Sequence, residues 1–216
     1  MHCTLTRRAR KCYDSITMAT VIVGLGNPGG EYANTRHNAG RMALEAYAKH
    51  AGFEDFAPRK AASAFVTDGM IDGEKIQLVM PEVFMNQSGK GVTSFVKSVK
   101  AAKKLLVIRD DLDLPIGTIK MTVHGRGSGG HKGVESIMRA LKTKEFAQLK
   151  VGISGASAKG RVRKPAGEDK VVSHVIGKFS PKEKDALKKV FMKTNQAIEL
   201  FITDGIDAAM LAANTR

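Results

Sequence analysis

VIVGLGNPGGEYANTRHNAG, residues 21–40, is the stretch that decides the fold. Its apolar beginning, Val21-Ile22-Val23, predicts a buried strand over residues 20–25. Glycines and polar residues follow, and helical periodicity starts only near Asn38, which predicts a helix over 38–51. Strand, loop and helix in this order are typical of an α/β fold, and His37 lies in the loop where sites in such sheets tend to form.

The glycines of this loop have the spacing of a dinucleotide-binding motif, Gly24-x-Gly26-x-x-Gly29. Pro28 argues against that interpretation, because proline has no N–H to donate to a pyrophosphate. The helix of such a motif should also begin at the third glycine, whereas Gly30 continues the loop here. We therefore expect no nucleotide cofactor. A dinucleotide enzyme stays as an alternative, which would bind nucleotide tightly and show no preference for tRNA.

A second glycine-rich loop, GRGSGGHKG over residues 125–133, also lies between a predicted strand and a predicted helix. It is not an ATP-binding P-loop, because that motif requires Gly-Lys followed by Ser or Thr. A glycine-rich loop of this kind can still present backbone N–H groups to an anion.

The remaining sequence alternates between strand-like and helix-like periods, which predicts a single α/β domain with a mixed central sheet flanked by helices. Asp72-Gly73 predicts a tight hairpin, and Ser180, Pro181 and Glu183 predict the capped start of a long helix that Gly205 ends. The other predicted strands are 63–71, 75–80, 105–109, 118–123 and 149–154, the other predicted helices are 86–99 and 133–141, and 155–170 is predicted to be a basic loop.

The composition indicates a polyanionic partner. Thirty-five basic and 21 acidic residues give a net charge of +14, which favours nucleic acid binding. The two cysteines, Cys3 and Cys12, lie outside the predicted fold, so it holds no thiolate metal site or disulfide framework. No apolar run is long enough to cross a membrane.

Residues 1–17 are expected to be a disordered or non-native extension, with the domain spanning 18–216. We expect Met18 to be the true start, because the first predicted strand follows it directly. We expect a cytoplasmic location. An acid-poor leader with four basic residues would instead suit an organelle if residues 1–17 were a transit peptide.

His37 is the strongest catalytic candidate among the six histidines. Asp110 ends a second buried strand and is expected at the same edge of the sheet. A buried carboxylate bonded to one imidazole nitrogen fixes the tautomer and stabilises the imidazolium formed during proton transfer. Such a pair alone is as compatible with a structural role as with a catalytic one.

Seven ordered blocks of sequence carry a resemblance to a known family. They are GLGNPG (24–29), YANTRHNAG (32–40), PEVFMNQSGK (81–90), DDLDLP (110–115), GGHKG (129–133), KVGIS (150–154) and GKF (177–179). In these blocks the chain resembles the bacterial-type peptidyl-tRNA hydrolase family, and the resemblance covers residues 20 to about 212.

The resemblance implies hydrolysis of the ester between an N-blocked peptide and the 3′ ribose of tRNA, which recycles tRNA from peptidyl-tRNA dropped off during translation. It implies that His37 is the general base that activates water and that Asp110 orients it. It also implies that Asn27 and Asn86 hold backbone groups of the substrate, since an amide offers both a donor and an acceptor. A monomer without metal or cofactor is expected.

Further roles follow from the resemblance. Residues expected to bind the peptide and the tRNA 3′ end are Tyr32, Phe84, Met85, His131 and Lys132. Residues expected near tRNA phosphates are Lys120, Lys150 and Lys90, although each lysine alone is equally compatible with a solvated side chain.

One position departs from the family pattern, because His131-Lys132-Gly133 stands where the family has His-Asn-Gly. Lysine keeps a donor, loses the amide acceptor and adds a charge. An alternative of another class is a pure RNA-binding module, since some organellar splicing factors resemble this family without hydrolysing its substrate. The presence of Asn27, His37, Asn86 and Asp110 argues against it, because RNA binding alone needs no positioned base.

Overall fold

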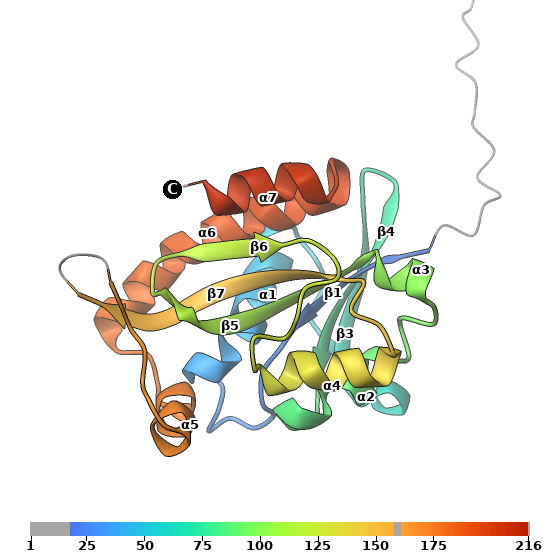
Figure 1. The fold of residues 1–216 in the computed structure, drawn as a ribbon. Coiled ribbons are helices and arrows are strands. Elements are labelled where there is room, and N and C mark those ends of the chain that lie inside the picture. The colour runs from blue at the N-terminus through green and yellow to red at the C-terminus, as the bar shows by residue number, and fades with distance from the viewer. Residues whose placement is uncertain (1–17, 158–160, 216) are drawn as a thin grey trace, which may run out of the picture.

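A twisted β-sheet runs through the middle of the protein in the computed structural model, which describes residues 18–157 and 161–215 (Figure 1). The strand order is β2-β3-β4-β1-β5-β7-β6, and β8 pairs with the end of β7. The strands are β1 (Thr20–Gly24), β2 (Ala57–Arg59), β3 (Ala64–Ile71), β4 (Glu74–Pro81), β5 (Leu105–Pro115), β6 (Ile119–Thr122), β7 (Ala147–Ala156) and β8 (Val162–Arg163).

Strands β4, β1, β5 and β7 are parallel, whereas β2, β3, β6 and β8 pair antiparallel with their neighbours. The sheet is therefore mixed, as the sequence predicts. The apolar run of β1 is buried on both faces, as expected of a central parallel strand.

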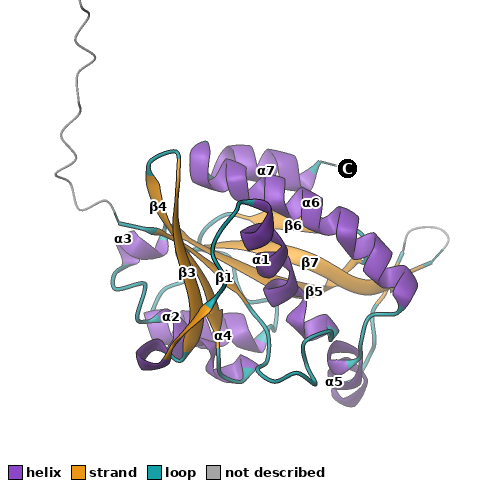
Figure 2. Cartoon of the chain, turned by 180° about the vertical axis from the view of Figure 1, so that it is seen from behind, coloured by secondary structure: helices purple, strands orange, loops and turns teal. Residues whose placement is uncertain are grey.

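Helices cover both faces of the sheet. Helices α1, α6 and α7 lie on one face of the sheet (Figure 2), and their side chains pack there with Ile22 and Ile108. Side chains of α2 and α4 pack with Val23 and Val107 on the other face. The helices are α1 (Ala39–His50), α2 (Ser88–Val92), α3 (Val99–Ala102), α4 (Lys132–Leu141), α5 (Glu168–Ile176), α6 (Pro181–Thr203) and α7 (Ile206–Asn214), with short 3₁₀ turns η1 (Arg36–Asn38), η2 (Lys60–Ala62) and η3 (Met85–Gln87).

Helix α1 packs unusually close to the sheet at its first turn. A Cβ on Gly40 would lie 2.3 Å from the carbonyl oxygen of Ile108, and a Cβ on Gly24 would lie 2.7 Å from the carbonyl oxygen of Gly40. Glycine at both positions allows this contact. It brings η1, directly before α1, beside β5, where His37 contacts Asp110.

Most of the predicted elements are confirmed with small shifts at their ends. The hairpin turns at Asp72-Gly73, both with positive φ (48° and 80°), and α6 has the predicted capping box between Ser180 and Glu183. The first helix begins at Ala39, well beyond Gly29, so the loop does not have the geometry of a dinucleotide site.

The predicted helix over 86–99 is wrong. This segment forms η3, the short α2 and a separate α3 whose N-cap is Ser98. Gly89 and Gly91 lie within the predicted helix and weaken it, and the Ser98 side chain accepts a hydrogen bond from the Ala101 N–H, which starts a new helix.

The basic segment 155–170 is more ordered than the sequence predicts, because β7 continues to Ala156, β8 follows and α5 begins at Glu168. Residues 158–160 and the proposed extension over 1–17 lie outside the described residues.

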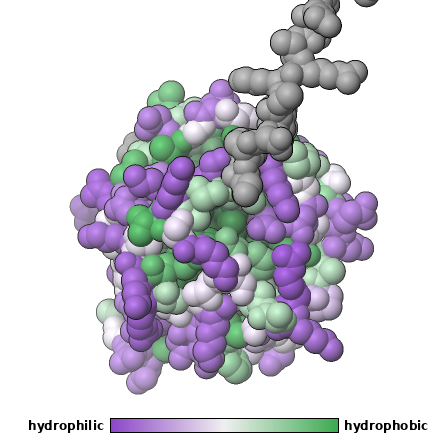
Figure 3. All heavy atoms as spheres, turned by 90° about the vertical axis from the view of Figure 1, so that its right-hand side faces the viewer, coloured by the Kyte–Doolittle hydropathy of each residue, from purple (hydrophilic) through white to green (hydrophobic). Residues whose placement is uncertain are grey.

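No helix of the described part is long and apolar enough to cross a membrane. The side from which β1 and β5 start mixes hydrophilic and apolar side chains (Figure 3).

Candidate active site

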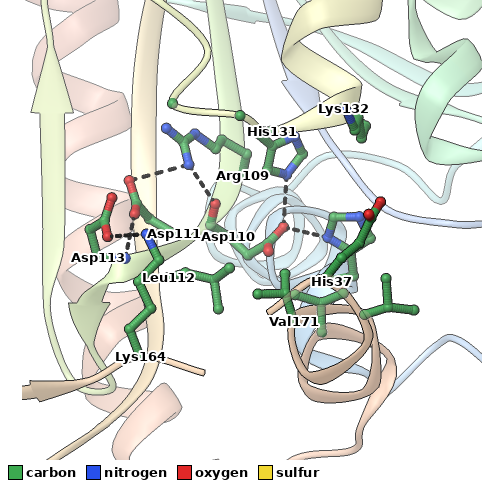
Figure 4. Close-up of a pocket in the computed structure, with 15 residues that line it drawn as sticks. His37, Arg109, Asp110, Asp111, Leu112, Asp113, His131, Lys132, Lys164 and Val171 are labelled. Carbon is green, nitrogen blue, oxygen red and sulfur yellow. Dashed lines mark hydrogen bonds and ion pairs between the residues drawn. The ribbon is translucent and has the colours of Figure 1, made fainter. Parts of the chain in front are cut away.

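Two loops and one strand meet at the carboxyl edge of the central strands. His37 lies in η1 between β1 and α1, and His131 directly precedes α4. Asp110 belongs to β5, which extends six residues beyond the predicted end of the strand at Arg109. The predicted pairing of His37 with Asp110 is present in the structure, and His131 joins it (Figure 4).

Both histidines bind the same carboxylate oxygen. His37 Nδ1 and His131 Nε2 each lie 2.9 Å from Asp110 Oδ1. An ionised carboxylate only accepts hydrogen bonds, so both of these ring nitrogens carry a proton. In neutral His37 the other nitrogen, Nε2, therefore has a free lone pair and can accept a proton.

The tautomer of His131 is fixed from the other side of its ring. His131 Nδ1 accepts the N–H groups of Gly133 and Val134, at 3.2 and 3.4 Å, and so caps α4. Protonation of Nδ1 would place a positive charge against two donors at the positive end of a helix. His131 is therefore held neutral, as an N–H donor to Asp110.

The three groups shift one another's proton affinity. Burial opposes ionisation of Asp110, but the two histidines outweigh it and hold the pKa of Asp110 well below its usual range. Burial lowers the pKa of His37, but the Asp110 charge and hydrogen bond raise it above 6.5 overall. Burial outweighs Asp110 for His131, whose pKa is lowered. The site thus contains one basic and one neutral histidine around a permanent anion.

The same three side chains offer ligand atoms within 4.8 Å of one another, close enough to consider a metal ion. Coordination by His131 Nε2 would require its proton to move to Nδ1, which already accepts two backbone N–H groups. The arrangement therefore suits hydrogen bonding better than metal binding.

A cavity of about 230 Å³ opens beside this group. His37, Asp110, His131 and Lys132 contribute to its lining, so four of the predicted site residues share it. Helix α5 forms an apolar wall with Val171, Val172 and Val175, which sequence reasoning missed. No side chain of α5 is fully buried, and Val175 also packs against the hydrophobic core.

Asn27 and Met85 are joined by a hydrogen bond from the Met85 N–H to Asn27 Oδ1, at 2.8 Å. The backbone of Asn27 exchanges two further hydrogen bonds with the Asn38 side chain. Asn38 was not predicted as a site residue, although its place next to His37 was a signal. Both Asn27 and Met85 are buried, and neither lines the cavity.

Other predicted contacts lie outside the cavity. Asn86 and Lys90 are exposed and line a separate depression with Arg139. Phe84 is also exposed, and Tyr32 is half-buried in the loop before η1. None of these four side chains lines the cavity beside His37.

The predicted phosphate-binding lysines fall into two places. Lys120 and Lys150 are direct neighbours on β6 and β7 and share a cavity of about 490 Å³, whereas Lys90 lies on α2. Lys150 also pairs with Asp111, at 3.3 Å. Lys132 is largely exposed at the start of α4 and lies 3.6 Å from Glu135.

Comparisons with known proteins point to one family. The family described as "Peptidyl-tRNA hydrolase" matches residues 21–216. The peptidyl-tRNA hydrolase of Herpetosiphon aurantiacus is 39% identical over 198 residues, covering 90% of this chain and 89% of the relative. That of Halalkalibacterium halodurans is 40% identical over 182 residues, covering 84% and 92%.

A solved structure gives the same result in three dimensions. The crystal structure of peptidyl-tRNA hydrolase from Acinetobacter baumannii aligns with a TM-score of 0.80 at 30% identity, covering 93% of this chain and 97% of that one. Fold and relatives together define an α/β enzyme that hydrolyses esters. The chain belongs to the peptidyl-tRNA hydrolase family.

Proposed function

We propose that this protein hydrolyses the ester between an N-blocked peptide and the 3′ ribose of tRNA, and so recycles tRNA from peptidyl-tRNA dropped off during translation. The observation that carries the proposal is the His37–Asp110–His131 group beside the cavity. It supplies a base whose tautomer is fixed and whose pKa is raised, next to space for a substrate.

In the proposed reaction, His37 Nε2 removes a proton from a water molecule as its oxygen attacks the ester carbonyl carbon. The tetrahedral intermediate then collapses, the bond to the ribose 3′ oxygen breaks, and the His37 imidazolium returns the proton to that oxygen. Asp110 stabilises the imidazolium between the two steps. The products are the free peptide acid and a tRNA with a free 3′ hydroxyl group.

We propose substrate-binding roles for the amides and apolar side chains around the group. The hydrogen bond from the Met85 N–H to Asn27 Oδ1 orients the Asn27 amide, and Asn86 follows Met85 directly. These amides would bind backbone groups of the peptide, and Tyr32, Phe84 and Met85 would contact the terminal nucleotide and the peptide. His131 would act through Asp110, and Lys132 lies at the rim of the cavity.

The RNA part of the substrate is supported by charge. The net charge of +14 favours a polyanion, and Lys120 and Lys150 lie side by side in their own cavity. We propose that these two lysines bind tRNA phosphate. Lys90, on another element, would contact the RNA separately. We also expect a monomer in the cytoplasm, without a cofactor.

The test is release of tRNA from N-acetyl-aminoacyl-tRNA by the purified full chain, compared with the same tRNA carrying an unblocked amino acid. Release from the blocked form only is expected. Binding of both tRNAs without release, even at high enzyme concentration, would refute hydrolysis and favour the RNA-binding module.

A further inference from the structure

Three basic side chains form a lateral row across the sheet beside the site. Arg109 on β5 is paired in register with Lys150 on β7, which is paired with Lys120 on β6. Residues paired in register point to the same face of a sheet, and neighbouring strands lie about 4.8 Å apart. The row therefore extends about 10 Å from the neighbour of Asp110 to the edge strand.

The ion pairs of this row involve one carboxylate. Within residues 18–157 and 161–215, Asp111 is the one carboxylate within ion-pair distance, 3.2 Å from Arg109 Nη1 and 3.3 Å from Lys150 Nζ. Like charges on directly paired positions repel each other. Asp110 and Asp113 also attract Arg109 from farther away. Lys120 has no ion pair in the described part of the chain, so the outer end of the row can attract an anion.

Arg109 has an unused hydrogen-bonding edge. Its side chain is 3% exposed, and Nη1 donates to the carbonyl oxygen of Asp110, at 2.9 Å. Arg109 Nε and Nη2 have no hydrogen-bond partner within the described part of the chain. These two N–H groups point the same way along one edge of the planar guanidinium, which is the fork that binds phosphate bidentately. Buried donors left unpaired are unfavourable, so this edge points to a ligand.

Arg109 also lies beside the active-site cavity. It lines the same cavity as His37 and Asp110, and Figure 4 shows its guanidinium on the opposite side of Asp110 from His37. Gly129 lies over it, with the position of an added Cβ 3.4 Å from Nη2, and Gly129 lines both this cavity and that of Lys120 and Lys150. The glycine-rich loop thus joins the two cavities above the row.

We propose that Arg109 binds a phosphodiester of the single-stranded 3′ end of the substrate RNA, close to the ribose that carries the ester. Lys150 and Lys120 continue the row toward further phosphates, so Arg109 is its inner end. This inference rests on the proposed function, because it assigns the RNA strand to the cavity of His37. It makes Arg109 a residue that positions the terminal ribose.

The test compares two esters that differ in phosphate. N-acetyl-aminoacyl-tRNA contains the phosphodiester, whereas N-acetyl-aminoacyl-adenosine has the same ester without phosphate. For Arg109→Gln we expect kcat/KM on the tRNA to fall about tenfold more than on the adenosine ester, the effect of losing charge-assisted hydrogen bonds. Arg59→Gln is the control, because it removes the same charge from an exposed site on β2, at the other edge of the sheet.

An equal fall in kcat/KM on both esters would overturn the proposal, since it would indicate a structural role for Arg109. Arg109→Lys is the second variant. It keeps a charge beside Asp111 and should fold even if Arg109→Gln does not, but it lacks the fork and is expected to show a smaller loss of the same kind.

A binding measurement keeps the two proposals distinguishable. The salt slope of binding to a deacylated RNA ending in CCA should decrease by about one for Arg109→Gln and stay unchanged for Arg109→Lys. If wild-type protein cleaves neither ester, the proposed function fails while this slope still tests Arg109. An unchanged slope for Arg109→Gln would overturn the phosphate contact.

Discussion

His131 Nε2 lies 2.9 Å from Asp110 Oδ1, the same oxygen that His37 Nδ1 contacts at 2.9 Å. The carboxylate therefore divides its hydrogen-bonding capacity between one histidine that faces the cavity and one that caps α4. Because the cap fixes the tautomer of His131, the start of α4 is coupled to the basicity of His37. Substitution of His131 and substitution of Asp110 should shift the pKa of His37 in opposite directions.

Replacement of His131 by Asn separates its two functions. Asn can still cap α4 but is too short to reach Asp110. With one donor fewer, the Asp110 charge acts more strongly on His37, whose pKa should rise further. We expect the acid limb of kcat/KM to move to higher pH and kcat to fall roughly tenfold. His50→Asn, on the exposed side of α1, is the control, and an unmoved acid limb would contradict the coupling.

Asp110→Asn should shift the pH dependence of kcat/KM in the opposite direction, to lower pH. The carboxylate raises the pKa of His37 above 6.5, so a neutral amide should let this pKa fall and move the acid limb to lower pH. Turnover should nevertheless fall by about 10²–10⁴-fold, because the amide neither orients nor stabilises the imidazolium. A pH series of initial rates measures both effects. Asp68→Asn, exposed on β3, is the control, and retained turnover would remove Asp110 from the mechanism.

His37→Ala is the corresponding test of the base. It should abolish turnover while leaving affinity for tRNA nearly unchanged, because the RNA contacts lie mainly on phosphate. Gel-shift affinity and single-turnover hydrolysis measure the two properties separately. A variant that still turns over would show that His37 is not the base.

Local sequence patterns were sufficient for much of the fold. Pro28 and the delayed start of α1 excluded a dinucleotide loop, and Ser180 with Glu183 marked the start of α6. The pairing of His37 with Asp110 was also predictable, because each follows an apolar run and the two runs pair as parallel strands.

Other features depend on tertiary contacts that a local pattern does not contain. Helix α5 is an exception, because the spacing of Val171, Val172, Val175 and Ile176 is a local helical signal that the predicted elements do not include. The fixed tautomer of His131 requires the distant Asp110, and nothing in the run of β5 indicates that Arg109 is buried with two free donors. Asn86 illustrates the opposite case, since its motif was recognisable but its side chain does not line the cavity.

Arg36 joins the histidine loop to α6. Its Nη2 lies 3.1 and 3.0 Å from the two carboxylate oxygens of Glu183, which also accepts the Ser180 N–H in the capping box. Arg36→Met should lower the free energy of unfolding by about 1–2 kcal/mol, because it removes a partly buried charge-assisted pair. It should also lower kcat severalfold, since His37 is the next residue.

The control for Arg36 is Glu183→Gln, which can keep the capping box and loses only the charge. Urea unfolding of both single variants and the double variant gives the coupling energy. If the two effects simply add, the pair does not stabilise the loop.

Lys132 tests how the departure from the family pattern affects RNA binding. It is 70% exposed at the rim of the cavity, and its only ion pair among the described residues is with Glu135 on the same helix. An ion pair between exposed side chains is weak, so the ammonium group is available to phosphate. Overall binding should weaken steeply with salt, and Lys132→Asn should reduce the salt slope by about one. The acid limb of the pH profile, which His37 sets, should stay in place, because the exposed charge is screened.

Lys144→Asn, beyond the other end of α4, removes the same charge away from the cavity and should leave the salt slope closer to that of the wild type. Equal slopes for wild type and Lys132→Asn would show that Lys132 makes no phosphate contact.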